Sequence, residues 1–308
     1  MSILLIAKNR DMTPFREKLL DADPNLDVEI WPDINQKERV HFAVAWNHPQ
    51  NVWHNYPNLK VISSLGAGVD HLVNDESIPK SVSLARIVTH SLKCDMADFV
   101  LNSVHNLLQN RHHYYQQQQK AEWKQHQAIQ KNSVTVGLMG LGEIGQFVGG
   151  LLTKNGFNVT GWSRGKKEID GIKSFSQNEL KSFLNETTIL VCLLPLTSET
   201  EDILDLELFK KLRKPAFLIN AGRGEHLVEE DLLYALDTNI LKGAALDVFC
   251  EEPLPDRHPF WNRKNIIITP HIAALSDPEE TADQILENYK RTLSGLPLLN
   301  KVDSDRGY

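Results

Sequence analysis

A glycine-rich turn near the middle of the chain constrains the fold most strongly. It reads Gly140-Leu141-Gly142-Glu143-Ile144-Gly145, with an apolar run over 134–139 before it and an amphipathic stretch over 144–155 after it. A dinucleotide-binding unit requires this order of strand, tight turn and helix, because glycines let backbone N–H groups approach a pyrophosphate and the helix dipole favours its charge. Without its flanks the pattern would indicate only an ordinary turn. With them, it predicts a nicotinamide cofactor contacted by Gly140, Gly142, Glu143, Ile144 and Gly145.

The segment about 20 residues beyond this turn indicates which nicotinamide cofactor binds. NAD-specific folds place an acidic side chain there, on the ribose 2′-OH, but here the expected strand 158–162 runs into Ser163-Arg164-Gly165-Lys166-Lys167. A guanidinium pairs with a phosphate through its planar fork, and an ammonium adds a point charge. The loop therefore favours NADPH (NADP) over NADH, although a solvated basic loop is the alternative. The expected contacts are Ser163, Arg164, Lys166 and Lys167.

Composition excludes several classes of protein. The chain has 308 residues, enough for two domains, and its net charge of -7 argues against nucleic acid or an anionic membrane as a partner. No apolar segment reaches the roughly 18 residues of a membrane span, and the first residues lack the basic start of a secretion signal, so we expect a cytoplasmic protein. Cys94, Cys192 and Cys250 are widely spaced, which indicates packing residues rather than a metal site or a disulfide framework.

Hydrophobic patterning predicts two parallel sheets. Before the glycine turn, short apolar runs alternate with amphipathic ones; after it, near-continuous apolar strands are expected at 188–194, 216–221, 243–248 and 266–269. Strands that are covered by helices on both faces lose polar alternation. The prediction is an α/β fold with two doubly wound parallel-sheet domains, one a Rossmann nucleotide-binding domain and one flavodoxin-like, with a cleft between them.

Two segments connect these halves. Apolar residues over 94–110 have helical spacing, so one long helix is expected to cross from one domain to the other. A glutamine-rich stretch then begins at Gln116. Its neighbours Tyr114, Tyr115 and Trp123 are apolar anchors that a disordered linker does not need. An arm packed on a partner subunit and a helix packed on its own chain both remain open, with the arm slightly favoured.

Three polar residues follow expected strands in the second half, at the edge where open α/β sheets bind ligands. Arg223 can bind a carboxylate and polarise a neighbouring carbonyl, and an α-keto acid offers both groups. His271 can deliver a proton near neutrality. Glu252 can pair with the other ring nitrogen of His271, although charge alone would allow Glu251 in its place. Each assignment is weak by itself, but together they predict hydride transfer to a carbonyl with His271 as the proton donor.

These motifs carry a family resemblance over nearly the whole chain. The glycine turn, Asn220-Ala221-Gly222-Arg223-Gly224, the segment 246–255 and Thr269-Pro270-His271 resemble the ordered signatures of the D-isomer-specific 2-hydroxyacid dehydrogenases. More narrowly, 64–70, 121–124, 161–164 and the closing 305–308 resemble the bacterial glyoxylate/hydroxypyruvate reductases of that family. The resemblance implies NADPH-dependent reduction of glyoxylate to glycolate and of hydroxypyruvate to D-glycerate. It also implies that Arg223, Glu252 and His271 are the catalytic residues, which favours Glu252 over Glu251.

The resemblance implies further roles for residues and domains. Substrate would be contacted by Trp46 and, opposite Arg223, by backbone N–H groups of the loop Leu65, Gly66, Ala67, Gly68 and Val69. Pro195, Ala221 and Asp247 would line the cofactor. A discontinuous substrate-binding domain is expected at 1–94 and 278–308, and an NADP-binding domain at 95–277, with a dimerisation arm near 112–131 and a homodimer as the assembly. A reductase for a bulkier 2-keto acid and a nicotinamide-sensing regulatory protein on the same fold are the alternatives.

Overall fold

The chain divides into two compact units, each described by itself. The computed structural model describes residues 1–303 and 306–308, so Asp305 of the closing segment compared above lies outside the described residues. The terminal unit comprises Met1–Leu92 and Leu275–Tyr308, and the central unit comprises Lys93–Ala274. The sequence prediction placed the changeovers after residues 94 and 277, two and three residues later along the chain.

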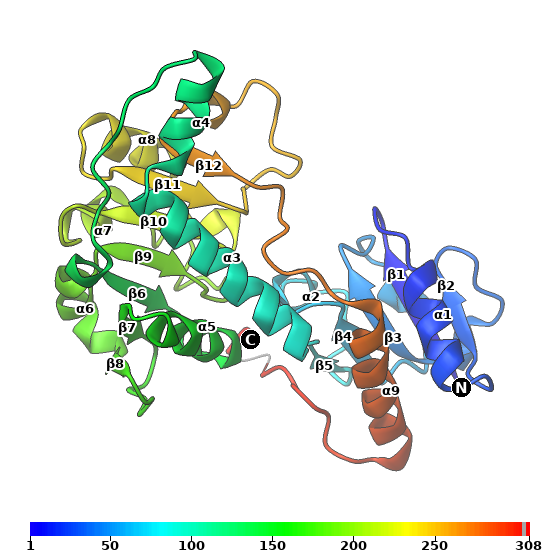
Figure 1. Ribbon diagram of the computed structural model, residues 1–308. Helices are drawn as coiled ribbons and strands as arrows, with labels where there is room; N and C mark the ends of the chain where they lie inside the picture. Colours follow the sequence, from blue (N-terminus) through cyan, green and yellow to red (C-terminus); the bar gives the residue numbers. More distant parts are fainter. Residues whose placement is uncertain (304–305) are drawn as a thin grey trace. The chain divides into compact units, whose positions relative to one another are not determined.

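The terminal unit is built on a five-stranded parallel sheet in the order β2-β1-β3-β4-β5 (Figure 1). Its strands are β1 (Ser2–Ala7), β2 (Val28–Ile30), β3 (Val40–Trp46), β4 (Val61–Ser64) and β5 (Ser83–Ala85). Along β1, Ile3 and Leu5 pack with helices α1 (Thr13–Ala22) and α9 (Pro278–Ser294), whereas Leu4 and Ile6 belong to the core on the opposite face. The short helix α2 (Asp70–Val73) contributes to that opposite face. This strand order is the flavodoxin-like one.

The central unit is built on a seven-stranded parallel sheet in the order β12-β11-β10-β9-β6-β7-β8. Its strands are β6 (Thr135–Met139), β7 (Asn158–Trp162), β8 (Ile172–Phe175), β9 (Ile189–Cys192), β10 (Phe217–Asn220), β11 (Gly243–Leu246) and β12 (Ile266–Ile268). Six of these strands, β8-β7-β6-β9-β10-β11, follow the Rossmann order 3-2-1-4-5-6, and β12 adds one more at the edge. The switch point of the topology, where ligands bind in such sheets, lies between β6 and β9. The predicted α/β class with two parallel sheets is confirmed.

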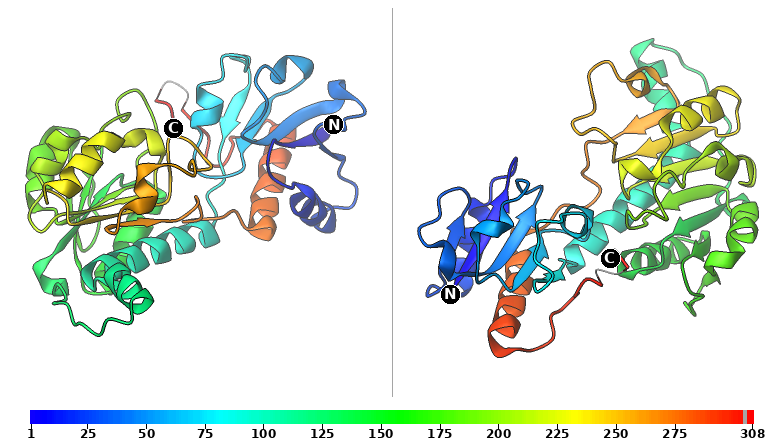
Figure 2. Two further views of the ribbon diagram at one scale, coloured as in Figure 1. Left: turned by 90° about the horizontal axis from the view of Figure 1, so that it is seen from above. Right: turned by 180° about the vertical axis from the view of Figure 1, so that it is seen from behind.

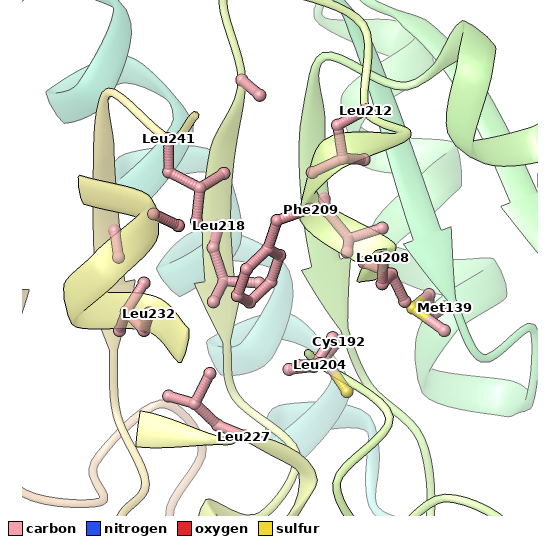
Figure 3. Packing of buried hydrophobic residues seen from close by; sticks show 14 of the residues in the cluster. Met139, Cys192, Leu204, Leu208, Phe209, Leu212, Leu218, Leu227, Leu232 and Leu241 are labelled. Atoms are coloured by element: carbon pink, nitrogen blue, oxygen red, sulfur yellow. The ribbon is translucent and has the colours of Figure 1, made fainter. Parts of the chain in front are cut away.

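Helices cover both faces of the central sheet (Figure 2). On one face, α3 (His90–Leu108) and α5 (Glu143–Lys154) pack against alternate strand residues such as Val136 and Val191. On the other, α6 (Leu180–Glu186), α7 (Leu206–Lys210) and α8 (Glu229–Asp237) pack against the intervening residues, and Figure 3 shows Phe209 beside Leu218 in this core. The 3₁₀ turns are η1 (Lys37–Arg39), η2 (Trp53–Asn55), η3 (Lys131–Ser133), η4 (Gln177–Glu179), η5 (Gly224–His226) and η6 (Pro259–Asn262). No helix of the described residues is long and apolar enough to cross a membrane.

The glutamine-rich segment is ordered. It forms helix α4 (Arg111–Gln119), after which the chain runs back along the helix without regular structure. Gln117 is buried and joins the two parts: its Nε2 donates to the carbonyl oxygens of Glu122 (3.3 Å) and Lys124 (2.9 Å), and its Oε1 contacts His126 Nε2 (2.6 Å). Trp123, just after the turn, has a relative exposure of 104%. Gln117 therefore stabilises a segment whose largest aromatic side chain is exposed to solvent.

Two glycines of α5 give a matched test of packing. A Cβ at Gly145 would lie 1.9 Å from the carbonyl oxygen of Gly140, whereas a Cβ at Gly150 would meet nothing within 4 Å. We expect Gly145→Ala to lower the free energy of unfolding by about 1–3 kcal/mol, because backbone must move to relieve the clash. Gly150→Ala should raise it by up to about 1 kcal/mol through helix propensity. Urea unfolding measures both, and equal effects at the two positions would refute the close packing.

Candidate active site

The three glycines of the turn occupy three different environments. Gly140 has φ +107, and a Cβ there would lie 2.7 Å from the carbonyl oxygen of Leu193, so the turn between β6 and α5 requires glycine. Gly145 allows the first turn of α5 to rest on Gly140. At Gly142, by contrast, a Cβ would meet nothing within 4 Å. This combination of a tight turn, an open position and a close helix contact is what a bound pyrophosphate requires.

The first turn of α5 is suited to an anion. The helix begins at Glu143, and its N-cap residue Gly142 supplies no side-chain hydrogen bond. Backbone N–H groups at such an end lack partners within the helix and carry the positive end of its dipole. The side chain of Glu143 lies 4.0 Å from Lys93 Nζ, and Ile144 is partly buried against the core shared with α3. The predicted cofactor residues of the turn are thus brought together at the switch point of the sheet.

The basic loop after β7 lies against the glycine turn. Lys167 Nζ donates to the carbonyl oxygen of Leu141 (2.6 Å), and Ser163 Oγ donates to that of Gly165 (2.9 Å). The guanidinium of Arg164 is partly exposed and lies 3.7 Å from Glu199 Oε2. A phosphate bound by Arg164 would therefore compete with a carboxylate that the sequence analysis did not identify. Lys166 is exposed in the same loop.

His271 and Glu252 form a hydrogen-bonded pair. His271 Nδ1 lies 2.7 Å from Glu252 Oε2, and the backbone N–H of Phe249 donates to Glu252 Oε1 (3.0 Å). Burial would raise the pKa of Glu252, but the hydrogen bonds from His271 and Phe249, with the charges of His271 and Arg223, outweigh it and lower that pKa. The carboxylate therefore stays ionised and accepts from Nδ1–H of the imidazole. Nε2 is then the ring atom at which a proton can be exchanged with another molecule.

The backbone around His271 is held by the carboxylate of Asp247, which is 1% exposed. Its Oδ1 accepts from Thr269 Oγ1 (2.6 Å) and from the N–H of Ile272 (2.9 Å), and its Oδ2 accepts from the N–H of Ala273 (2.8 Å). His271 itself has φ +53 and donates its N–H to the carbonyl oxygen of Asp247 (2.8 Å). The carboxylate of Asp247 therefore stabilises the turn that carries His271, whereas the sequence analysis had assigned this residue only to the cofactor.

Arg223 follows β10 and lies close to the other two residues. Its Nη1 donates to the carbonyl oxygen of Gly222 (2.8 Å), and its backbone N–H donates to Nδ1 of His226 (3.1 Å). A Cβ at Gly224 would lie 2.0 Å from the carbonyl carbon of Phe249, so only glycine lets this loop pack on the segment that leads to Glu252. The structure thus brings together Arg223, Glu252 and His271, with Ala221 and Pro195 on the loops beside them.

The predicted substrate residues of the terminal unit form a cluster of their own. Trp46 packs over Gly66, where a Cβ would lie 3.4 Å from its ring, and Ser276 Oγ donates to the carbonyl oxygen of Leu65 (2.8 Å). The N–H groups of Leu65 and Gly66 already donate, to the carbonyl oxygen of Ala45 (3.0 Å) and to Ser64 Oγ (3.3 Å). The prediction that the whole loop offers N–H groups therefore narrows to its last three residues, Ala67, Gly68 and Val69.

Comparison with known proteins identifies the family. Residues 101–273 match the profile of the family described as "D-isomer specific 2-hydroxyacid dehydrogenase, NAD binding domain". The chain belongs to the D-isomer-specific 2-hydroxyacid dehydrogenases. Glyoxylate/hydroxypyruvate reductase A of Yersinia enterocolitica is 38% identical over 291 residues, 92% of this chain and 93% of its own length. The enzyme of that name from Escherichia fergusonii is 34% identical over 314 residues, 100% of both chains.

Solved structures of this dehydrogenase family agree in fold. A D-isomer specific 2-hydroxyacid dehydrogenase from Xanthobacter autotrophicus Py2, in complex with NADPH and MES, matches with a TM-score of 0.94 and 34% identity over 100% of this chain and 99% of its own. An NADPH-dependent glyoxylate/hydroxypyruvate reductase from Sinorhizobium meliloti, in complex with NADP and sulfate, matches with a TM-score of 0.93 and 36% identity over 100% of both chains. The family membership predicted from the motifs is confirmed.

Sequence reasoning missed several residues around the site of this dehydrogenase. His226 and Glu199 touch predicted site residues but belong to no motif that the sequence analysis recognised, and Thr269, which stands in the motif with His271, was given no role of its own. Their contacts join residues on different strands or loops, except for His226, which lies three positions after Arg223. That spacing was visible, yet only the burial of His226 distinguishes it from an ordinary loop residue.

The lowered pKa of Glu252 predicts a pH dependence. A carboxylate with a folded pKa below its ordinary 4.5 stabilises the fold fully above that value and loses the contribution as the pH falls through the lowered pKa. We expect Glu252→Gln to unfold with a weaker pH dependence than the wild type between about pH 5 and about pH 3. Urea unfolding at stepped pH measures it. Glu251→Gln, one residue earlier, is the control and should keep the wild-type dependence; a change at both positions or at neither would contradict the assignment.

Proposed function

We propose that the protein catalyses NADPH-dependent reduction of small 2-keto acids, glyoxylate to glycolate and hydroxypyruvate to D-glycerate. The observation that carries this proposal is the Glu252–His271 pair beside Arg223, on the sheet edge that also carries the glycine turn. Full-length relatives that carry the name glyoxylate/hydroxypyruvate reductase A support the choice of substrate. The family membership supports the reaction class.

The cofactor site follows from the glycine turn. The pyrophosphate of NADPH would bind at Gly142 and the first N–H groups of α5, where no side chain fills the space. Arg164 and Lys166 would bind the 2′-phosphate, while Lys167 and Ser163 hold the loop that carries them. Pro195, Ala221 and the backbone near Asp247 would face the nicotinamide. Similar chains solved with NADPH or NADP support this choice of cofactor.

The chain's own residues would supply the proton and the orientation of the substrate. When bound, NADPH supplies a hydride to the carbonyl carbon. His271, held by Glu252 through Nδ1, would donate the proton on Nε2 to the carbonyl oxygen, so that the carbonyl group becomes an alcohol and the imidazole becomes neutral. The ionised Glu252 accepts a hydrogen bond from Nδ1–H and fixes the orientation of the ring for the transfer. Arg223 would bind the keto acid and stabilise charge on the carbonyl oxygen.

In the terminal unit, we propose that Ala67, Gly68 and Val69 offer their N–H groups to a substrate carboxylate and that Trp46 limits access of water. We also propose a homodimer that uses the arm near 112–131, which includes most of α4. The exposure of Tyr115, at 67%, and of Trp123 supports a covered surface there, because large aromatic side chains are seldom left in water.

The proposed function is tested by following the loss of NADPH absorbance with glyoxylate, hydroxypyruvate and phenylpyruvate. Turnover is expected with the two small acids. His271→Asn should lower kcat by about 10²- to 10⁴-fold, because proton delivery is lost while the cofactor site is intact. His54→Asn, an exposed histidine of η2, is the control and should retain wild-type turnover. A preference for phenylpyruvate would indicate a bulkier substrate, and cofactor binding without turnover of any 2-keto acid would favour a regulatory protein.

Arg164 is expected to discriminate between the two cofactors. Arg164→Ala should raise the KM for NADPH by about 10- to 100-fold, the value of a charged hydrogen-bonded contact, and leave the KM for NADH nearly unchanged. The control is Lys173→Ala on β8, which removes a cation paired with Glu186 in the same unit. Steady-state kinetics with each cofactor measures the effect. An equal loss for NADPH and NADH would remove Arg164 from the 2′-phosphate site.

A further inference from the structure

We infer that His226 is a positioning residue that ties the Arg223 loop to the Pro195 loop through a neutral imidazole, and so aligns the substrate side of the site with the cofactor side. This inference rests on the proposed function, because it gives each loop the role proposed above. None of the motifs or resemblances considered above assigns His226 a role. The evidence is its burial and two hydrogen bonds of its ring, beside which Cys192 Sγ lies 3.7 Å from Nδ1.

The imidazole of His226 is fully buried, at 0% exposure, within η5. The backbone N–H of Arg223 donates to its Nδ1 (3.1 Å), and its Nε2 lies 3.3 Å from the carbonyl oxygen of Pro195. An N–H group can only donate and a carbonyl oxygen can only accept, so Nδ1 must be bare and Nε2 must carry the hydrogen. Both bonds therefore form only in the neutral tautomer protonated on Nε2.

The two bonds join loops that leave neighbouring strands. Pro195 follows β9 and Arg223 follows β10, and these strands are paired in register up to Cys192 and Asn220. Beyond the last pair the N–H of Ala221 still donates to the carbonyl oxygen of Cys192 (3.3 Å), and the ring of His226 then contacts both loops. Gly222 makes room for the ring, because a Cβ there would lie 3.0 Å from His226 Cε1.

Each end of this bridge is fixed by a second contact. Thr200 Oγ1 also donates to the carbonyl oxygen of Pro195 (2.7 Å), and the side chain of Asn220 donates to the carbonyl oxygen of Arg223 (2.9 Å). The carbonyl oxygen of His226 accepts from the N–H of Leu204 (2.8 Å), which anchors η5 itself. The ring is therefore a spacer between two loops, each of which is also held by a further hydrogen bond.

An apolar side chain would fill the same space but would not have the same effect. It would leave the partly buried N–H of Arg223 without its ring acceptor, which is unfavourable, and the carbonyl oxygen of Pro195 with Thr200 Oγ1 but without the ring. The loops would relax to find other partners. Displacements of about 1 Å in a reactive constellation lower rates by about 10²-fold, so a small relaxation is enough to be measured.

Two conservative variants separate the two bonds. The amide oxygen of asparagine can take the place of Nδ1, so His226→Asn should keep the bond from Arg223 and lose the bond to Pro195. The amide nitrogen of glutamine can reach the place of Nε2, so His226→Gln should keep the bond to Pro195 and lose the bond from Arg223. A residue that is needed only for packing would give the same kinetic change in both variants.

The expected kinetic changes are opposite. His226→Asn should raise the Kd for NADPH about tenfold and leave the KM for glyoxylate within about twofold of wild type, whereas His226→Gln should raise the KM for glyoxylate about tenfold and leave the Kd for NADPH nearly unchanged. Fluorescence titration gives the Kd and steady-state kinetics gives the KM. Equal changes in both constants, or no change in either variant, would overturn the inference.

Two further measurements keep the result interpretable. Wild-type turnover of glyoxylate is measured first. If the wild type reduces no 2-keto acid, the proposed function fails. If the wild type is active but the two variants change the Kd for NADPH and the KM for glyoxylate equally, only the role of His226 is contradicted. If a variant does not fold, ¹⁵N NMR of histidine-labelled wild type at neutral pH tests the tautomer directly. A neutral ring protonated on Nε2 supports the bridge, and a ring protonated on Nδ1 or on both nitrogens refutes it.

Discussion

The buried carboxylate of Asp247 is the contact on which the geometry of the candidate site depends. It accepts two backbone N–H groups and a threonine hydroxyl from the turn that carries His271, and it allows that histidine to adopt a left-handed backbone conformation. Charge-assisted hydrogen bonds of this kind are stronger than neutral ones, and a buried carboxylate needs all of them to offset its lost hydration. The position of His271 is therefore fixed by the backbone of its turn, independently of the hydrogen bond between its side chain and Glu252.

Contacts between loops also fix the geometry along the rest of this edge of the central sheet. Loops that leave neighbouring strands are joined in sequence: Pro195 to Arg223 through His226, the Arg223 loop to Phe249 through the bare Cα of Gly224, and Glu252 to His271 through a hydrogen bond. Parallel strands bring their carboxyl ends to one edge, but they do not fix the loops beyond it. In this protein, side-chain hydrogen bonds and close contacts at glycines fix each loop to the loop that follows the neighbouring strand.

Much of this arrangement was predictable from the sequence, and the remainder has a physical reason for being hidden. The apolar runs at 188–194 and 216–221 marked β9 and β10, and the glycine turn marked the start of α5, because these features are local. The three-residue strands β2 and β5 carry too few residues to show a period, whereas β12, of the same length, was predicted from its run of isoleucines. The predicted site residues stood at strand ends, but the partners of Asp247 and His226 depend on which loops meet in space. The hydrogen bonds from the N–H groups of Leu65 and Gly66 to Ala45 and Ser64 could not be predicted for the same reason.

The glycine turn also limits how such a protein can evolve. At Gly140 and Gly145 a side chain would clash with the protein backbone, so substitutions at these two positions would disrupt the turn rather than tune its affinity. The loop over 163–167 has the opposite character, since its side chains reach outward from a backbone anchored by Lys167. A lineage that exchanged one dinucleotide for another would accumulate its changes in that short loop and leave the turn untouched.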